Sequence, residues 1–384
     1  MRKKIFPDWF CLIDGRNNFQ IEPYRDREFL FGNSEWRDKI EHYLYKADLL
    51  SMALRLIFWG QYGIGKTHLL RYLQYIIENS DYPYETYYLH ASDIQDKTGF
   101  EHLLYEMVTV LGFDSMRNML RNYQLKYPLD DGQSEYKFCQ DNPDVNKAFS
   151  TLVHPSEKPA LAAWNYLSGR KLENIKEQEI AGVSKRLLEK ASDFAAVIQV
   201  FANIIEEMTG RQLLYLVDEC ENFTRITNRT LEARWNESLR ALLDIQNLGI
   251  VMTVGAEKTD NIPVLILRPD IVRRIHRAHY IQMNAFKPAD TEVFLKGLLK
   301  MWVDDDKRSA LEASEKFDEE IEGYDPSLYP FTVKGFKYFC STVAVDPRNA
   351  KPSEILAKLN SAAGESFDKH RLISQELLSS IDLS

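Results

Sequence analysis

The chain has 384 residues, 45% of them hydrophobic, which is enough to bury one large core and a smaller second one. Its net charge of -9 argues against a protein that grips nucleic acid over its whole surface, because such binding depends on clustered Lys and Arg; a local basic patch remains open. The four cysteines lie far apart without a C-x-x-C pair, so neither a zinc site nor a disulfide framework is indicated.

No stretch approaches the roughly 18 consecutive apolar residues of a membrane span. The first ten residues also lack a long apolar segment followed by a small-residue cleavage site. We therefore expect an unexported, cytoplasmic protein with reduced cysteines and no membrane partner.

The predicted strands alternate with predicted helices. Residues 1–30 mix aromatic and charged side chains without periodicity, and a helix is expected to begin at Asn33 or Ser34. Short apolar runs bounded by turn residues are typical of buried strands, and helical apolar spacing fills the stretches between them. The expected strands are 54–59, 86–89, 212–217 and 249–254. This alternation predicts an α/β fold, with a parallel sheet covered by helices on both faces.

Two segments depart from the alternation. Residues 115–190 are polar and rich in proline, which indicates an irregular or helical insertion in the α/β domain. Pro288 marks a boundary, and the residues after it show helical spacing without strands. The prediction is an αβα domain over 1–288 and a helical lid domain over 289–384.

A glycine-rich stretch follows the first apolar strand and precedes an amphipathic helix. It fits G-x-x-x-x-G-K-S/T, in which glycines let backbone N–H groups wrap a phosphate at the positive end of a helix. Lys66 is expected to reach the β- and γ-phosphates, and the Thr67 hydroxyl to ligate Mg²⁺. His68, inside the helix, is expected to pack rather than to catalyse. With Asp218, discussed next, the predicted nucleotide-binding residues are Gly60, Gln61, Tyr62, Gly63, Ile64, Gly65, Lys66, Thr67, His68 and Asp218.

An acid pair ends the apolar strand 213–217. Because strands of a parallel sheet present their carboxyl ends at the edge where nucleotides bind, Asp218 is expected to help hold Mg²⁺ and Glu219 to polarise the attacking water. An acidic helix cap at a strand end is the other interpretation, and Glu221 is expected to be merely solvated. The predicted cofactors are ATP and Mg²⁺, since no base-specifying N-K-x-D segment of a GTPase is present.

Together these motifs resemble the AAA+ ATPases, in particular the branch containing origin-recognition and Cdc6-type initiators and the transposition regulators TnsC and TniB. Residues 24–32 look like the segment that precedes the P-loop in that branch and packs near the adenine. Residues 248–256 look like its fourth strand, which leads to the sensor 1 position. No Asn stands at that strand end, so Thr253 or Glu257 must serve, or the sensor is lost. The resemblance implies an ATPase that is slow without a partner.

The arginines extend this resemblance. Residues 268–277 resemble the stretch that carries an arginine finger to a neighbouring subunit, with Arg273, Arg274 and Arg277 as candidates. Residues 346–349 resemble the sensor 2 motif, which makes Arg348 the cis arginine. A guanidinium can spread its charge over phosphate oxygens in the transition state. The alternatives are a solvated basic helix face for the first three arginines and a salt-bridged surface residue for Arg348. The predicted catalytic residues are Glu219, Lys66, Arg273, Arg274 and Arg348.

A further resemblance concerns the insertion. Residues 162–169 and 213–221 are similar to ATP-binding proteins of bacteriophage-exclusion (BREX-type) defence systems. The resemblances imply a switch or motor that oligomerises with ATP as a ring or filament. It would act on duplex DNA or a DNA-bound partner in replication, transposition or antiviral defence. The alternative is a signalling or scaffold ATPase that recruits an effector or nuclease protein without binding DNA, which the acidic charge favours.

Overall fold

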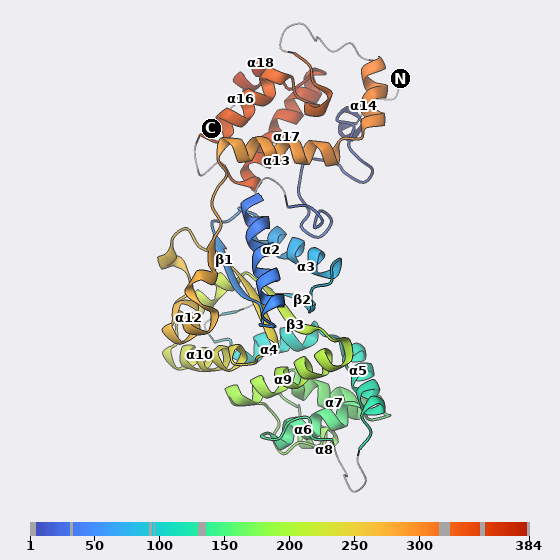
Figure 1. Ribbon diagram of the computed structural model, residues 1–384, viewed down its shortest axis with the longest axis vertical. Coiled ribbons are helices and arrows are strands. Elements are labelled where there is room, and N and C mark those ends of the chain that lie inside the picture. Colours follow the sequence, from blue (N-terminus) through green and yellow to red (C-terminus); the bar gives the residue numbers. More distant parts are fainter. Residues whose placement is uncertain are drawn as a thin grey trace. The chain divides into compact units, whose positions relative to one another are not determined.

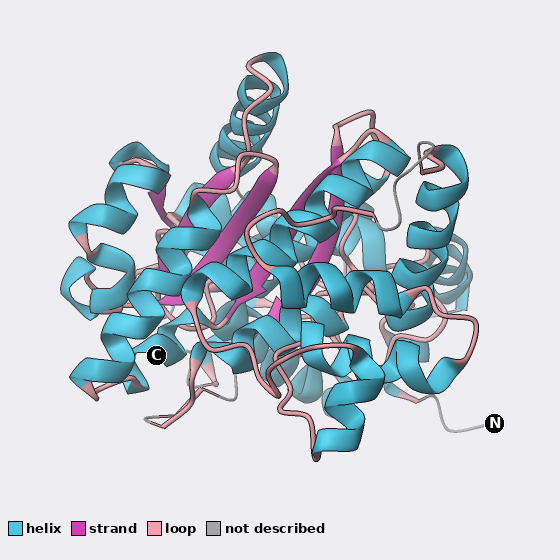
Figure 2. Ribbon diagram, turned by 90° about the horizontal axis from the view of Figure 1, so that it is seen from below, coloured by secondary structure: helices cyan, strands magenta, loops and turns pink. Residues whose placement is uncertain are grey.

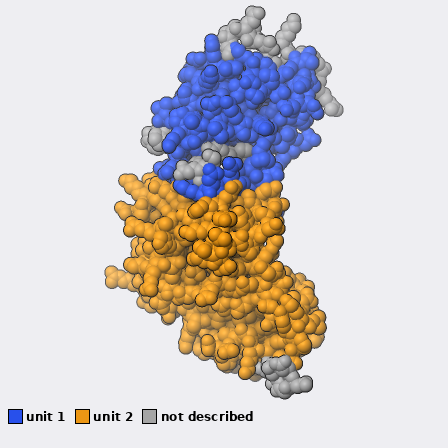
Figure 3. All heavy atoms as spheres, viewed as in Figure 1, with its two compact units in different colours: residues 1–40, 61–72, 283–384 blue, residues 41–60, 73–282 orange. Residues whose placement is uncertain are grey.

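The computed structural model of the protein describes residues 5–30, 34–91, 94–95, 97–129, 136–314, 323–345 and 350–381 (Figure 1). The chain forms two compact units, which Figure 3 distinguishes by colour. Unit 1 consists of Met1–Ile40, Gln61–Tyr72 and Met283–Ser384; unit 2 consists of Glu41–Gly60 and Leu73–Gln282. The chain therefore passes from one unit to the other directly after the strand that ends at Gly60.

A five-stranded parallel sheet forms the centre of unit 2, and its strands follow one another in the order β2-β3-β4-β1-β5. Figure 2 shows the strands in magenta among the cyan helices. Its neighbours in register include Gly60 with Gly255 and His90 with Asp218, so these residues mark one edge of the sheet. All residues of β4 except its last are buried, which means that both faces of the sheet are covered. The strands are β1 Arg55–Gly60, β2 Tyr84–His90, β3 Gln212–Asp218, β4 Leu248–Gly255 and β5 Tyr280–Gln282. The predicted α/β class and parallel sheet are confirmed.

The helices of unit 2 pack their apolar stripes on this sheet. In α9, buried residues recur at the spacing of one helix face, including Phe194, Val197 and Phe201, and the helix ends at Gly210 in the left-handed conformation. One continuous core joins α9 to the sheet residues Leu213 and Tyr215. The elements outside the insertion are α4 Phe100–Thr109, α9 Ala191–Thr209, η1 Cys220–Arg225, α10 Arg229–Leu243, η2 Thr259–Asn261, α11 Val264–Leu267, α12 Pro269–Ile275 and η3 Arg277–His279.

The insertion is helical where the structure describes it. Pro143 is the first residue of α6, a position at which the backbone N–H that proline lacks would have no partner within the helix. The Asn142 side chain caps the same helix by accepting a hydrogen bond from Val145 N. The insertion shares the core of the sheet, since the Phe149 and Phe201 rings lie 4.8 Å apart between centroids. Its helices are α5 Phe113–Lys126, α6 Pro143–Leu152, α7 Glu157–Leu167 and α8 Ile175–Ala181. Pro143 thus begins a helix rather than breaking one.

Unit 1 joins the N-terminal segment to the C-terminal helices. The Asn360 side chain both donates to Phe19 O and accepts from Phe19 N, each at 2.9 Å, as a paired strand would. The helices are α1 Phe6–Trp9, α13 Pro288–Trp302, α14 Asp305–Ser314, η4 Pro326–Leu328, α16 Val333–Val343, α17 Pro352–Lys369 and α18 Gln375–Ser379. Two helices, α2 Ser34–Leu49 and α3 Lys66–Glu78, contribute residues to both units. The predicted helical C-terminal part is confirmed.

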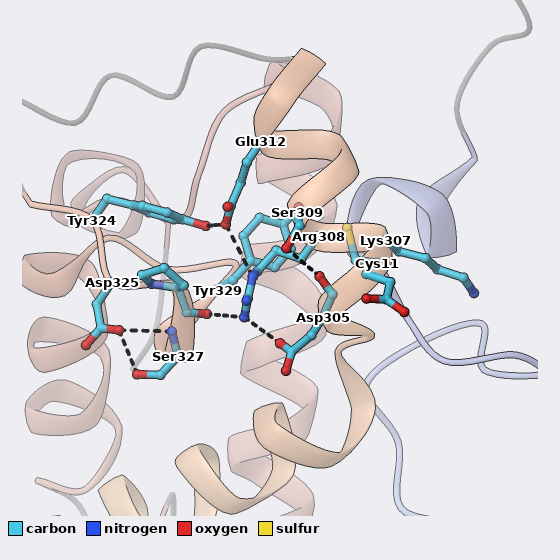
Figure 4. A network of polar contacts seen from close by, with 12 residues as sticks. Cys11, Asp305, Lys307, Arg308, Ser309, Glu312, Tyr324, Asp325, Ser327 and Tyr329 are labelled. Atoms are coloured by element: carbon cyan, nitrogen blue, oxygen red, sulfur yellow. Dashed lines mark hydrogen bonds and ion pairs between the residues drawn. The ribbon is translucent and has the colours of Figure 1, made fainter.

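Arg308 of α14 is the centre of a polar network in unit 1 (Figure 4). It pairs with Asp305 at 2.7 Å and Glu312 at 3.2 Å, and donates to Pro326 O at 2.9 Å. The neighbouring Lys307 donates to Leu12 O at 3.0 Å. These contacts tie α14 to the turn at η4 and to the N-terminal segment.

Among the helices that the structure describes, none combines the length and apolar character needed to cross a membrane.

Candidate functional site

The glycine-rich loop links β1 to α3 and has the backbone conformation that its glycines permit. Gly63 has φ +79° and Gly65 has φ +98°, a region that residues with a Cβ rarely adopt. A Cβ added at Gly65 would meet nothing within 4 Å, so the loop is open on that side. The loop leads into the N-terminus of the 13-residue helix α3, whose first N–H groups have no partner within the helix. The loop therefore offers an open cradle for an anion.

Lys66 lies inside this loop. Its side chain donates from Nζ to Gln61 O at 3.0 Å and lies 5.2 Å from the centre of the Tyr62 ring. The residue is only 8% exposed, and Thr67 beside it is half-buried. Ile64 is buried and Gly60 is the last residue of β1. The ammonium group is thus hydrogen-bonded within the loop. To bind a phosphate, it would have to release the Gln61 carbonyl.

His68 connects the loop helix to the N-terminal segment of unit 1. Its Nε2 lies 2.6 Å from Phe29 O, and because a carbonyl only accepts, that nitrogen carries the hydrogen. Burial lowers the pKa of the imidazole below its usual 6.5. This contact agrees with the packing role expected for His68, and it fixes the segment predicted to lie near an adenine.

Tyr24 and Asp26 of that segment differ in their exposure to solvent. Tyr24 is 65% exposed, with the Arg27 guanidinium 4.8 Å and the Arg71 guanidinium 5.7 Å from its ring centre. Asp26 is buried, paired with Arg16, and accepts from Glu22 N at 2.8 Å. The segment therefore has an anchored inner carboxylate and an exposed aromatic ring flanked by cations. Residues 31 and 32 of the predicted stretch lie outside the described residues.

The first turn of α17 touches the loop within unit 1. Ser353 N donates to Gly63 O at 3.3 Å, and a Cβ on Gly63 would overlap Ser353 Oγ. A side chain at this position would therefore force the Ser353 side chain to move, in addition to the strain of its φ angle. Residues 346–349, which include the predicted sensor 2 arginine Arg348, lie outside the described residues.

Asp218 is the centre of a buried polar cluster in unit 2. It is 2% exposed, and its Oδ1 accepts from the Thr253 hydroxyl and from Glu219 N at 3.0 Å. Its Oδ2 accepts from the Tyr88 hydroxyl at 2.7 Å. The donors come from β2, β4 and the turn after β3. A buried carboxylate is costly unless it is hydrogen-bonded, so these donors stabilise Asp218 and orient it.

Glu219 follows in a conformation that is uncommon for a residue with a side chain. Its φ of 61° and ψ of 34° are left-handed, and its carbonyl accepts from Asn222 N at 3.1 Å and Nδ2 at 3.0 Å. No described residue donates to its partly exposed carboxylate. Glu221 accepts from Gly255 N at 2.7 Å, so the expectation that it is merely solvated is wrong. The turn thus holds Glu219 by its backbone and leaves its carboxylate available.

The two sensor 1 candidates differ in the structure. Thr253 is fully buried and bonded to Asp218, whereas Glu257 is exposed. Sequence reasoning named Thr253 but missed Tyr88, since nothing in the sequence states that β2 is the neighbour of β3. The signal that the sequence offers is a tyrosine two residues before the end of β2, a strand whose residues are mostly half-buried.

The arginines of α12 also differ from one another. Arg274 donates from Nε and Nη2 to the two carboxylate oxygens of Asp244, at 2.6 and 2.9 Å, and this hydrogen bonding lowers the pKa of Asp244. The exposed Arg273 and Arg277 make no side-chain hydrogen bond or ion pair with any described residue. Arg274 is therefore ion-paired, which neither the finger role nor the solvated helix face anticipated, and the other two arginines remain available.

The sheet places the two motifs in order. β4 lies between β1 and β3, so Gly60, Thr253 and Asp218 follow one another along the carboxyl edge of unit 2. Within unit 2, β1 thus ends at Gly60 on the same edge of the sheet at which β3 ends at Asp218. This is the edge where open α/β sheets bind ligands. The chain is an α/β protein with a P-loop and a helical C-terminal part.

Comparison with known proteins gives weak structural similarities. No protein-family model matches the chain, and no curated protein matches it in sequence. The ORC2 protein of Aeropyrum pernix, solved as ADPNP-ADP complexes, is 13% identical over 96% of this chain and 70% of its own, with a TM-score of 0.46. Cdc6p from Pyrobaculum aerophilum is 9% identical over 88% and 63%, with a TM-score of 0.40. Domain III of the Thermotoga maritima replication initiation protein DnaA is 11% identical over 95% and 94%, with a TM-score of 0.36. Similarities of this size show no family, and function must be argued from the residues.

Proposed function

We propose that the chain is an AAA+ ATPase, related to the origin-recognition and Cdc6 branch, that binds ATP and hydrolyses it slowly without a partner. The observation that carries the proposal is the glycine loop that ends in Lys66 and Thr67 and follows β1, in a sheet where β3 ends at Asp218 just before Glu219. A P-loop followed by an acid pair of this kind serves phosphoryl transfer.

The donor set fits Mg²⁺. The Thr67 hydroxyl and the Asp218 carboxylate are hard oxygen ligands of the kind that Mg²⁺ accepts, usually with one or two carboxylates and the phosphates of a substrate. Among the described residues, no group of three or more His, Cys, Asp or Glu side chains could hold a metal by itself. Bound Mg²⁺ would neutralise charge on the phosphate oxygens.

The chain's own residues then have distinct roles. The loop N–H groups bind phosphate, and Lys66 exchanges its bond to Gln61 O for phosphate oxygens. Glu219, whose carboxylate is available, accepts the proton of the attacking water. Thr253 holds Asp218 and occupies the sensor 1 position.

We assign the arginine contacts by their pairing. Arg273, with Arg277 nearby, is the better finger for a neighbouring subunit's nucleotide, because Arg274 is already bound to Asp244. Arg348 is proposed as the cis arginine of the lid from its sequence context alone. A finger supplied by a neighbour would couple hydrolysis to assembly, so ATP should close a ring or filament. That assembly would act on DNA or a DNA-bound partner in replication, transposition or phage defence.

The test is the mass of the protein by light scattering with ATP, ADP or no nucleotide. The wild type should gain mass with ATP, and Lys66→Ala should not. Lys300→Ala, which removes an exposed lysine of α13, is the matched control and should behave as the wild type. An unchanged mass of the wild type with ATP would contradict the proposal.

A second candidate is a scaffold ATPase that recruits an effector or nuclease protein without binding DNA. The net charge of -9 favours it, because phosphate backbones repel an acidic surface. A gel shift of duplex DNA that needs ATP and weakens with salt would exclude this second candidate.

A further inference from the structure

Tyr88 and Asp218 face each other across neighbouring strands. In the β2–β3 register, Tyr88 lies opposite Leu216 and His90 lies opposite Asp218. Side chains two residues apart share a face of the sheet, so these four side chains lie on one face. The Tyr88 hydroxyl crosses diagonally to Asp218 Oδ2 at 2.7 Å, and its ring packs edge-on against His90, 4.9 Å between centroids. Packing and register together place this hydroxyl.

The carboxylate of Asp218 is held from two sides. Oδ1 accepts from Thr253 on β4, and Oδ2 accepts from Tyr88 on β2. A rotation of the carboxylate would break bonds to both neighbouring strands in a buried setting, where hydrogen bonds to a charged group are strongest. The plane of the carboxylate is therefore fixed before any ligand arrives.

We propose that Tyr88 is a positioning residue for Mg²⁺, acting through Asp218; the inference rests on the ATPase function proposed above. A carboxylate that ligates a metal, directly or through water, depends on outer partners for its orientation. Removing such a partner costs roughly 10- to 100-fold in metal affinity or activity. Thr253 and Tyr88 form such a pair, one for each oxygen of Asp218.

The test compares Tyr88→Phe with Tyr87→Phe. Both variants keep the aromatic ring and lose one hydroxyl of β2, but Tyr87 lies on the opposite face, packed 6.3 Å from the Tyr215 ring centre. Within the described parts of the chain, nothing hydrogen-bonds to the Tyr87 hydroxyl. The measurement is the affinity for a non-hydrolysable ATP analogue with and without Mg²⁺. The factor by which Mg²⁺ raises the affinity should fall roughly 10- to 100-fold in Tyr88→Phe and stay unchanged in Tyr87→Phe.

The affinity without Mg²⁺ should be the same in both variants and the wild type. An equal loss with and without Mg²⁺ would mean that Tyr88 supports the fold and not the metal site, which overturns the inference. In an Asp218→Asn background, Tyr88→Phe should change nothing further, because its partner carboxylate is gone.

Failure of the two proposals looks different. If the wild type gains affinity from Mg²⁺ and Tyr88→Phe keeps the whole gain, the role of Tyr88 is wrong and the ATPase proposal stands. If the wild type binds no ATP analogue at all, both are wrong.

Discussion

The glycine loop of unit 1 and the carboxylate cluster of unit 2 are built in different ways. The loop is contiguous, and the hydrogen bond from Lys66 Nζ to Gln61 O joins residues five apart. The cluster joins Asp218 to Tyr88, 130 residues away, and to Thr253, 35 residues away. Local geometry is specified by residue types at fixed spacing, whereas the cluster is specified by strand order and register. One region can be recognised in a sequence, and the other requires the fold.

The two regions also differ in how far they are organised without a ligand. The loop is open beside Gly65, and Lys66 must exchange its intraloop bond for a phosphate. The cluster is buried, and Asp218 already has donors on both oxygens. Preorganised groups stabilise charge without a cost of reorganisation at the moment of reaction. We infer that the loop adapts to the nucleotide and that the cluster does not.

The largest expected effect separates catalysis from binding. Glu219→Gln removes the available carboxylate and should slow hydrolysis roughly 10²- to 10⁴-fold while ATP affinity is kept. Glu221→Gln is the matched control, because a glutamine can still accept from Gly255 N, and its rate should stay near that of the wild type. Single-turnover kinetics with a separate binding measurement distinguish the two. Equal losses in both variants would show that the turn, and not Glu219 itself, matters.

The next effect tests the loop. Gly63→Ala and Gly65→Ala both force a side chain into a left-handed conformation, at about 1–2 kcal/mol each. Gly63→Ala also overlaps Ser353, and overpacking of this kind costs about 1–3 kcal/mol more. Urea unfolding should therefore show a larger loss for Gly63→Ala. Ser353→Gly should recover the difference in the Gly63→Ala background but not in the Gly65→Ala background; equal recovery would contradict the contact.

Most of the sheet was predictable because its strands are apolar runs bounded by turn residues. The predicted strand 212–217 and the helix after the glycine loop correspond to β3 and α3. The strand β5 was not predicted, since three residues carry no periodicity. The insertion was expected to be irregular or helical; it is helical where the structure describes it, and Pro143, expected to break an element, begins the helix α6.

The candidate site was predictable only where it is local. Residues of the loop and the acid pair follow from spacing, but Tyr88 was missed and Glu221 was misjudged. The hydrogen-bond partners of Tyr88 and Glu221 depend on which strands are neighbours in the sheet. The sequence of a single strand does not indicate which strands lie beside it. Thr253 was named as one of two candidates, and only the bond to Asp218 separates it from the exposed Glu257.

The next prediction concerns the arginines of α12, whose side-chain contacts, like those of the carboxylate cluster, depend on the fold. Its expected effect on the free energy of unfolding is smaller. Arg274→Ala should lower the free energy of unfolding by up to about 1 kcal/mol, since its pair with Asp244 is partly exposed, and Arg273→Ala should leave it unchanged. Added salt should reduce the loss. A double-mutant cycle of Arg274→Ala with Asp244→Ala measures the pair, and additive losses would mean that the pair contributes nothing.

The smallest effect concerns pH and compares His68 of unit 1 with His279 of unit 2. Burial lowers the pKa of His68 below 6.5, so the folded chain binds fewer protons than the unfolded one as pH falls through this range. The stability that the neutral ring provides is therefore complete above pH 6.5 and lost below it, at no more than about 1.4 kcal/mol per pH unit. His68→Gln, whose amide can still donate to Phe29 O, should remove that slope. His279 has a pKa lowered by burial in the same direction, so its slope should survive in His68→Gln and disappear in His279→Gln. Urea unfolding at several pH values between about 8 and 5 measures the slopes. If the wild type gained stability on acidification, the folded state would favour the protonated imidazole, and the prediction would be wrong.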